Sequence, residues 1–175
     1  MRNPSYFYLN NPVVGALYRC HGKEINFLGI VLSRAESETM DDKERTTSYA
    51  ANLLSMMEAD GAILTFGGAG QLSVDLMLLC GKCERLGIKT TLLYPEMART
   101  PDDPGFSDFV AEADSIVSTG NYEREVILPP MGRGVGGTHL LGSGLDASSS
   151  LRIPIRLIYA SANPMGASKL TGVQF

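Results

Sequence analysis

An apolar run leads directly into a glycine-rich turn in the stretch Ala62-Ile63-Leu64-Thr65-Phe66-Gly67-Gly68-Ala69-Gly70. The run has the character of a strand, and residues 74–86 that follow have the period of an amphipathic helix closed by Gly87. Glycines at such a turn let the backbone approach a ligand, and the free N–H groups of the next helix favour negative charge. The stretch therefore predicts a small-ligand site at the carboxyl edge of an open α/β sheet.

Strands and helices alternate on both sides of this stretch. Residues 25–32 are nearly continuous in apolar side chains, as in a central parallel strand, and residues 41–59 have a helical period. Further strands are expected at 89–94 and 115–118, with a short helix over 106–113 between them. Ser73 is the expected N-cap of the helix over 74–86. This order predicts an α/β fold with an open, doubly wound, mostly parallel sheet of the flavodoxin or Rossmann kind.

The regular pattern ends after Asn121. Residues 132–150 are rich in Gly and Ser and predict a loop, a lid or a disordered insert. Residues 151–159 alternate between apolar and polar as a half-buried strand does, and Pro154 places that strand at an edge or a bulge. We therefore expect a single domain over 1–175, with an N-terminal segment (1–24), a core (25–121) and an irregular C-terminal extension (122–175).

The composition excludes several classes of partner. The chain has 175 residues, with 15 Lys and Arg against 19 Asp and Glu, and no basic run that would attract nucleic acid or an anionic membrane. No apolar stretch approaches the roughly 20 residues that span a bilayer, and the first ten residues lack the features of a signal peptide. Three cysteines fit a reducing compartment. We therefore expect a cytoplasmic protein.

Two motifs suggest chemistry only weakly. The turn Gly68-x-Gly70-x-x-Ser73 lacks the third small residue of a dinucleotide site, and no Walker Gly-Lys-Ser/Thr occurs, so no nucleotide is expected. Either the turn cradles a ligand, or it simply requires the positive φ that glycine tolerates. Cys80-Gly81-Lys82-Cys83 has the spacing of a redox pair or half a zinc site, but it lies on the helix face expected to pack on the sheet. We expect these cysteines to pack in the core and no metal to bind.

Eight short motifs occur along the chain in a fixed order. They are Asn11-Pro12-Val13, Asp42-Lys43-Glu44-Arg45, Tyr49-Ala50-Ala51, Ala59-Asp60-Gly61, Gly87-Ile88-Lys89-Thr90, Glu112-Ala113-Asp114, Thr119-Gly120-Asn121 and Leu128-Pro129-Pro130-Met131. Their order resembles that in the component B subunits of glycine, sarcosine and betaine reductases and in the proprotein of D-proline reductase. The chain is similar to the C-terminal, pyruvoyl-subunit part of that family, best over about residues 8–131.

The resemblance implies an anaerobic amino-acid reductase that cleaves a C–N bond. In that family a precursor cuts itself at a cysteine, which becomes a pyruvoyl group; its carbonyl captures the substrate amine, and a selenocysteine on a partner protein displaces the nitrogen. Here no cysteine precedes Asn11, and Ser5 is the nearest residue that could form a pyruvoyl group. We therefore expect this chain to lack the pyruvoyl group and to be inactive in isolation.

Three functions remain open. The chain is a subunit of a selenoprotein-dependent reductase complex that binds an amino acid or a related amine, or a non-catalytic structural or regulatory paralogue, or a flavin- or nucleotide-binding module. The first function implies a homologous or N-terminal-fragment subunit and a selenoprotein as partners, in a homo- or hetero-oligomer. The expected ligand contacts are Gly67, Gly68, Gly70, Glu96, Thr119 and Asn121 at the strand ends, with Arg45 as a candidate carboxylate clamp.

Overall fold

The centre of the protein is a four-stranded sheet with the order β1-β2-β3-β8. The computed structural model describes residues 5–34, 39–67, 70–106, 110–133, 135, 137–140, 144–158 and 171–173. Strands β1 (Gly61–Leu64), β2 (Lys89–Glu96) and β3 (Ser115–Asn121) are parallel, and β8 (Thr171–Val173) is antiparallel to β3. The α/β class and the mostly parallel open sheet are confirmed. The three parallel strands follow one another across the sheet in the order of the chain. Rossmann-like and flavodoxin-like sheets reverse this order at one point, so neither of these strand orders is confirmed.

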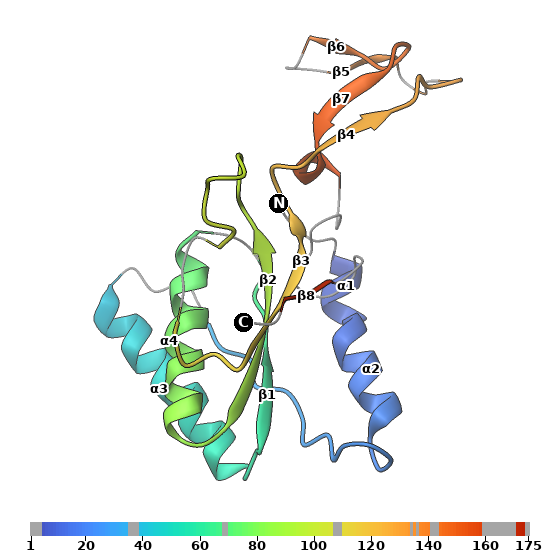
Figure 1. Cartoon of the computed structure of the whole chain (residues 1–175). Helices are drawn as coiled ribbons and strands as arrows, with labels where there is room; N and C mark the ends of the chain where they lie inside the picture. The colour runs from blue at the N-terminus through green and yellow to red at the C-terminus, as the bar shows by residue number, and fades with distance from the viewer. Residues whose placement is uncertain are drawn as a thin grey trace.

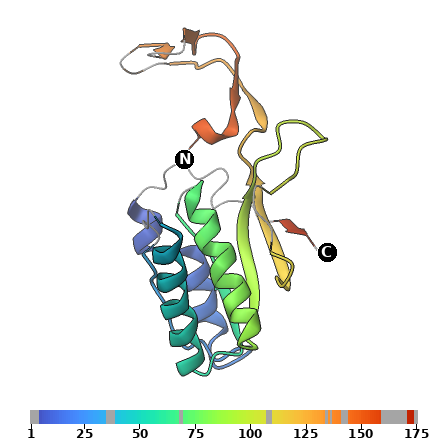
Figure 2. The same ribbon diagram turned by 90° about the vertical axis from the view of Figure 1, so that its left-hand side faces the viewer.

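Helices lie on both sides of the sheet (Figure 1, Figure 2). Helix α4 (Gln71–Arg85) connects β1 to β2 and packs beside α3 (Met40–Met56), whereas α1 (Ser5–Leu9) and α2 (Pro12–Cys20) lie on the opposite side of β1. These bounds confirm the helices expected over 41–59 and 74–86. Within the described residues, no helix is long and apolar enough to cross a membrane.

Charged side chains join α3 to α4. The ammonium of Lys43 lies 2.5 Å from Asp75 Oδ2, with both side chains nearly fully buried. Lys82 of α4 contacts Glu44 Oε2 at 2.6 Å, where the glutamate is half exposed, and Thr47 Oγ1, one turn after Lys43, at 2.7 Å. The two helices are therefore held together by one buried ion pair and one partly exposed ion pair as well as by apolar packing.

Glycines mark both ends of α4. The helix begins at Gln71 after Gly70, whose φ of 74° favours glycine. The prediction that Ser73 is the N-cap is wrong, because Ser73 lies in the first turn and its Oγ donates to the carbonyl of Gly70 at 2.6 Å. At the other end Gly87, with φ 82°, follows the last turn as predicted, and the N–H of Ile88 returns to the carbonyl of Cys83 at 2.9 Å.

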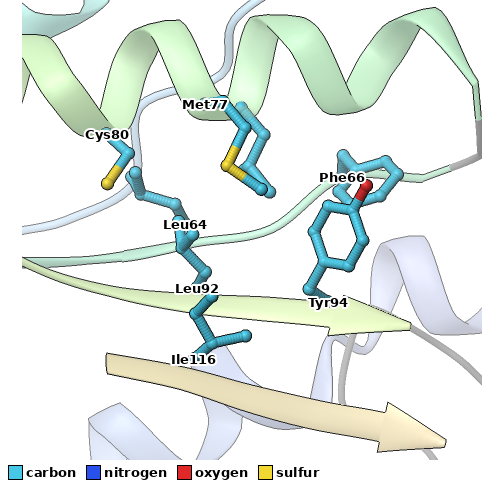
Figure 3. Packing of buried hydrophobic residues seen from close by; sticks show 8 residues of the cluster. Leu64, Phe66, Met77, Cys80, Leu92, Tyr94 and Ile116 are labelled. Atoms are coloured by element: carbon cyan, nitrogen blue, oxygen red, sulfur yellow. The ribbon is translucent and has the colours of Figure 1, made fainter. Parts of the chain in front are cut away.

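The main core lies between α4 and the sheet (Figure 3). Leu64, Leu92 and Ile116 meet Met77 and Cys80 of the helix there. Cys80 and Cys83 are fully buried, and burial raises the pKa of both thiols, that of Cys83 to about 11. The prediction that both cysteines of the C-x-x-C motif pack in the core is confirmed.

The expected central strand over 25–32 is absent from the sheet. Residues 26–34 belong to neither a helix nor a strand, and Leu32 is 92% exposed. The prediction is wrong because an apolar run forms a strand only where a neighbouring edge pairs with it, and within the described residues β1 pairs with β2 alone. The short helix expected over 106–113 is also not seen, since residues 110–113 form a turn; residues 107–109 lie outside the described part.

An arm projects from the end of β3 in both views (Figure 1, Figure 2). It contains β4 (Glu125–Leu128) paired with β7 (Leu151–Pro154), and a smaller hairpin of β5 (His139–Leu140) and β6 (Leu145–Asp146). The hairpin lies in the region expected to be a loop, of which 134, 136 and 141–143 lie outside the described residues. The strand expected over 151–159 stops at Pro154 and continues as the short helix η1 (Ile155–Leu157); Tyr159 is outside the described part.

Candidate functional site

The carboxyl ends of β2 and β3 meet at one edge of the sheet. Glu96, the last residue of β2, is paired with Asn121, the last residue of β3, after a register shift that follows Tyr94. The hydroxyl of Ser118 donates to Glu96 Oε1, and the N–H of Tyr122 donates to the carbonyl of Glu96 at 2.9 Å. These contacts fix the Glu96 carboxylate at the strand end, as expected for parallel neighbours.

Asn121 joins the loop after β2 to the turn after β3. Its Nδ2 donates to the carbonyl of Ala98 at 2.9 Å, and its Oδ1 accepts from the N–H of Glu123 at 2.8 Å. The second bond is the local Asx turn that asparagine favours. Because one side chain ties the two segments together, the groups that they carry are held near one another.

An open hollow of about 580 Å³ lies beside Asn121, between these two segments. This volume is within the range of small-molecule sites, which is roughly 300–1,000 Å³. Its walls combine backbone, amide and charged groups. They are formed by Ala98, Arg99, Thr100, Pro101, Asn121, Glu123, Arg124 and Glu125.

Some of the charged side chains around the hollow form ion pairs, and others do not. Glu123 forms an ion pair with Arg156, and Glu125 forms one with Arg152 at 3.2 Å. Arg124 is exposed and, within the described residues, takes part in no ion pair. A guanidinium in this state attracts a carboxylate, to which it can form two parallel hydrogen bonds.

A second arginine, Arg99, lies in the loop after β2. The N–H groups of Arg99 and Thr100 donate to Asp103 Oδ2 at 2.8 Å and 3.0 Å. The bonds from the backbone N–H groups of Arg99 and Thr100, with a smaller contribution from the Arg99 charge, lower the pKa of Asp103. Arg99 therefore follows a turn held by Asp103, and it lines the hollow together with Arg124. Both arginines were missed from the sequence, where the only signal is their position a few residues beyond a strand end.

Gly67 and Gly70 of the glycine turn are exposed. A Cβ added to Gly67 would lie 2.6 Å from the hydroxyl of Tyr8, so a side chain there would have to displace the Tyr8 ring of α1. The ring of Tyr94 contacts Phe66 in a tilted arrangement and Phe106 edge-on, with ring centroids 5.5 Å and 5.4 Å apart. Phe66 and Tyr94 lie side by side between α4 and β2 (Figure 3). Gly68 lies outside the described residues. The hollow is lined by residues after β2 and at the end of β3, and neither Gly67 nor Gly70 is among them.

The remaining predicted contacts lie apart from the hollow. Gly70 is exposed at the start of α4, and Thr119 is fully buried within β3. Arg45 is exposed on α3, where its guanidinium pairs with Asp42. The structure thus brings together Glu96 and Asn121 among the predicted residues. Ligand contact at each of the predicted residues stays a prediction.

Among the residues that the structure describes, no cluster of three or more His, Cys, Asp or Glu could hold a metal ion. Ser5, the single pyruvoyl candidate, is the first residue of α1, and its side chain lies outside the described part. The residues present therefore do not show a fit to a pyruvoyl group, and no step of a mechanism is assigned to one.

Comparison with known proteins identifies the family. The family model of glycine/sarcosine/betaine reductase component B subunits matches residues 1–172. The chain belongs to this family. No solved structure matches the chain at a significant level.

Its curated relatives are components of reductase complexes. Glycine reductase complex component B subunits alpha and beta from Peptoclostridium acidaminophilum is 34% identical over 178 residues, which are 97% of this chain and 41% of the relative. Sarcosine reductase complex component B subunit alpha from the same organism is 30% identical, over 95% of this chain and 41% of its own length. Betaine reductase complex component B subunit alpha, also from that organism, is 30% identical, over 98% and 42%. The chain thus spans about two fifths of the length of these relatives.

Proposed function

We propose that this chain is a subunit of an amino-acid reductase complex and that the hollow beside Asn121 binds the amino acid or amine. The observation that carries the proposal is that Arg99 and Arg124 line one hollow together with Asn121, the strand partner of Glu96 at the carboxyl edge of the sheet. The relatives named above belong to complexes for glycine, sarcosine and betaine. These three molecules share a carboxylate and a positively charged nitrogen.

The charges of the hollow match that shared chemistry. Arg124 and Arg99 would hold the ligand carboxylate, because guanidinium–carboxylate contacts are among the strong hydrogen bonds of proteins. The negative charge of Glu96, the strand partner of Asn121, would attract the charged nitrogen. The N–H groups of glycine and sarcosine could also donate to Asn121 Oδ1, whereas the quaternary nitrogen of betaine has no N–H to donate. The reaction itself is assigned to the assembled complex, with the reactive carbonyl and the selenol supplied by other chains.

Isothermal titration calorimetry tests the binding step on the purified full chain. Glycine, sarcosine and betaine are the ligands, and acetate and methylamine each carry half of the recognised chemistry. Arg124→Gln should weaken binding of the three amino acids about tenfold or more, because a hydrogen bond to a charged group contributes roughly 1.5–3 kcal/mol. Arg85→Gln is the matched control, since Arg85, the last residue of α4, is exposed and pairs with Glu112 away from the hollow.

Two results would count against the proposal. One is the absence of binding for all three ligands at about 10 mM, which corresponds to less than roughly 3 kcal/mol of affinity. The other is equal binding by Arg124→Gln and by the unmodified chain. Retained binding of acetate alone would assign the hollow to simple carboxylates and remove the role given to Glu96.

A further inference from the structure

The walls of the hollow offer no aromatic face to a ligand. None of the described residues that form them carries an aromatic ring. Tyr122 stands between Asn121 and Glu123 in the chain, but it is only 7% exposed and does not line the hollow. Proteins bind quaternary ammonium groups over aromatic faces, which attract a cation that has no N–H to donate. A fully methylated nitrogen therefore finds little in this hollow that suits it.

Glu123 gives the hollow an acceptor for an N–H instead. Its side chain is 24% exposed, against 58% for Glu125, so it is the more enclosed of the two glutamates in the walls. Arg156 Nη1 donates to Glu123 Oε2, and within the described residues no group donates to Glu123 Oε1. An ionised carboxylate accepts hydrogen bonds at both oxygens, so Oε1 is available to a donor from a ligand.

The position of Glu123 is fixed by the segments on either side of it. Its backbone N–H donates to Asn121 Oδ1 at 2.8 Å, and its carboxylate pairs with Arg156. The next residue is also held, because the N–H of Ile155 donates to the carbonyl of Arg124 at 2.7 Å. A carboxylate held in this way loses little further freedom when a ligand binds, which favours a specific contact.

We propose that the hollow selects ammonium groups that carry at least one N–H over quaternary ones, and that Glu123 determines this specificity. The inference rests on the proposed function, since it needs an amino acid or amine in the hollow. An N–H of the ligand donates to Glu123 Oε1 in a charge-assisted hydrogen bond. A quaternary nitrogen leaves this oxygen without that donor, and its methyl groups keep the positive charge further from the carboxylate. Loss of a hydrogen bond to a charged group lowers affinity about tenfold or more.

Isothermal titration calorimetry of the full chain with a methylation series tests the selection. Glycine, sarcosine, N,N-dimethylglycine and betaine keep one carboxylate and one positive charge, and they lose one N–H at each step until betaine has none. Affinity should change by less than about threefold at each of the first two steps, because an N–H is still present. It should fall at least about tenfold at the last step, when the final N–H is lost.

Glu123→Gln tests the role of the carboxylate. The substitution keeps the shape of the side chain but replaces a charged acceptor with a neutral one, which forms a weaker bond. The ratio of the affinities for N,N-dimethylglycine and betaine should therefore fall at least about threefold. Glu112→Gln is the matched control and should leave this ratio unchanged, since Glu112 also pairs with an arginine, Arg85, but does not line the hollow. Circular dichroism melts check that both variants are folded.

The affinity ratio separates this inference from a purely structural role of Glu123 and from the proposed function. A structural role would weaken all four ligands alike and leave the ratio unchanged, which would overturn the assignment of Glu123. Betaine bound as tightly as N,N-dimethylglycine would overturn the selection, although binding of both would still support an amine site. A loss of affinity at the first methyl group would assign the selection to space and overturn it as well. If none of the four ligands binds, the proposed function itself is refuted, and this inference with it.

Discussion

The buried ion pair between α3 and α4 gives the sharpest prediction on stability. Lys43 Nζ lies 2.5 Å from Asp75 Oδ2 and 3.2 Å from the carbonyl of Gln71, and the two paired side chains are only 4% and 8% exposed. The other carboxylate oxygen, Asp75 Oδ1, is buried without a hydrogen-bond partner among the described residues. Lys43 is therefore the group that compensates the buried negative charge of Asp75.

Lys43→Met removes the ammonium and keeps most of the side-chain volume. At 2.5 Å and an effective dielectric constant of about 20, the direct attraction is roughly 6–7 kcal/mol. Part of this is offset because the lysine no longer pays for leaving water, and measured losses for one partner of a buried pair are about 3–5 kcal/mol. With a urea m-value of about 2 kcal/mol/M, the unfolding midpoint should fall by roughly 1.5–2.5 M.

Urea unfolding followed by circular dichroism measures this loss. Lys43→Met/Asp75→Leu removes both charges and should regain most of the stability, since an apolar pair can replace a buried ion pair at little cost. Arg152→Met is the control: it breaks the exposed pair with Glu125 and should cost less than about 1 kcal/mol. A midpoint for Lys43→Met that matches Arg152→Met, or a double variant as unstable as the single one, would refute the reasoning.

Two further predictions concern the free energy of unfolding, one through the backbone at Gly87 and one through the titration of Cys83. Gly87→Ala should lower the free energy of unfolding by about 1–2 kcal/mol, because φ at this position is 82°, whereas Gly105→Ala should have little effect, since that backbone suits any residue and the site is open. Urea unfolding of both variants decides whether the left-handed geometry is the cause. Burial raises the pKa of the Cys83 thiol to about 11, so the unfolded chain loses this proton first as pH rises. The free energy of unfolding should therefore fall by about 1.4 kcal/mol per pH unit between pH 9 and 11, and Cys83→Ala should reduce this slope; equal slopes for the two proteins would contradict it.

Local sequence signals predicted the parts of the fold that local forces determine. Helix α4 was found because its apolar period and the glycine after its last turn act within a few residues of one another. Strands β1, β2 and β3 were found for a similar reason, as short apolar runs bounded by turns. Residues 25–32 have the same composition but remain outside the sheet, because strand formation also requires a free edge in the right place. Strand β8 was missed because its pairing with β3 depends on residues more than fifty positions away.

The candidate site was predicted only where topology decides it. The rule that parallel strands end at a common edge predicted that Glu96 and Asn121 would be neighbours, and the two residues do lie opposite each other. Arg99 and Arg124 lie in loops without periodicity, so their approach to one hollow depends on the tertiary fold. The glycine turn shows the opposite case, since its glycine served an internal contact with Tyr8 that no local pattern reveals.

The direct pairing of β3 with β8 has a consequence for how this protein can vary. The chain leaves the sheet at Asn121 and is back beside the same strand at Thr171, where Ser118 and Thr171 are partners. Residues 122–170 are therefore an insertion between two hydrogen-bonded neighbouring strands of the sheet. Its length and sequence can therefore change, or be exchanged for a short linker by an engineer, without altering the order of the strands that carry the rest of the molecule.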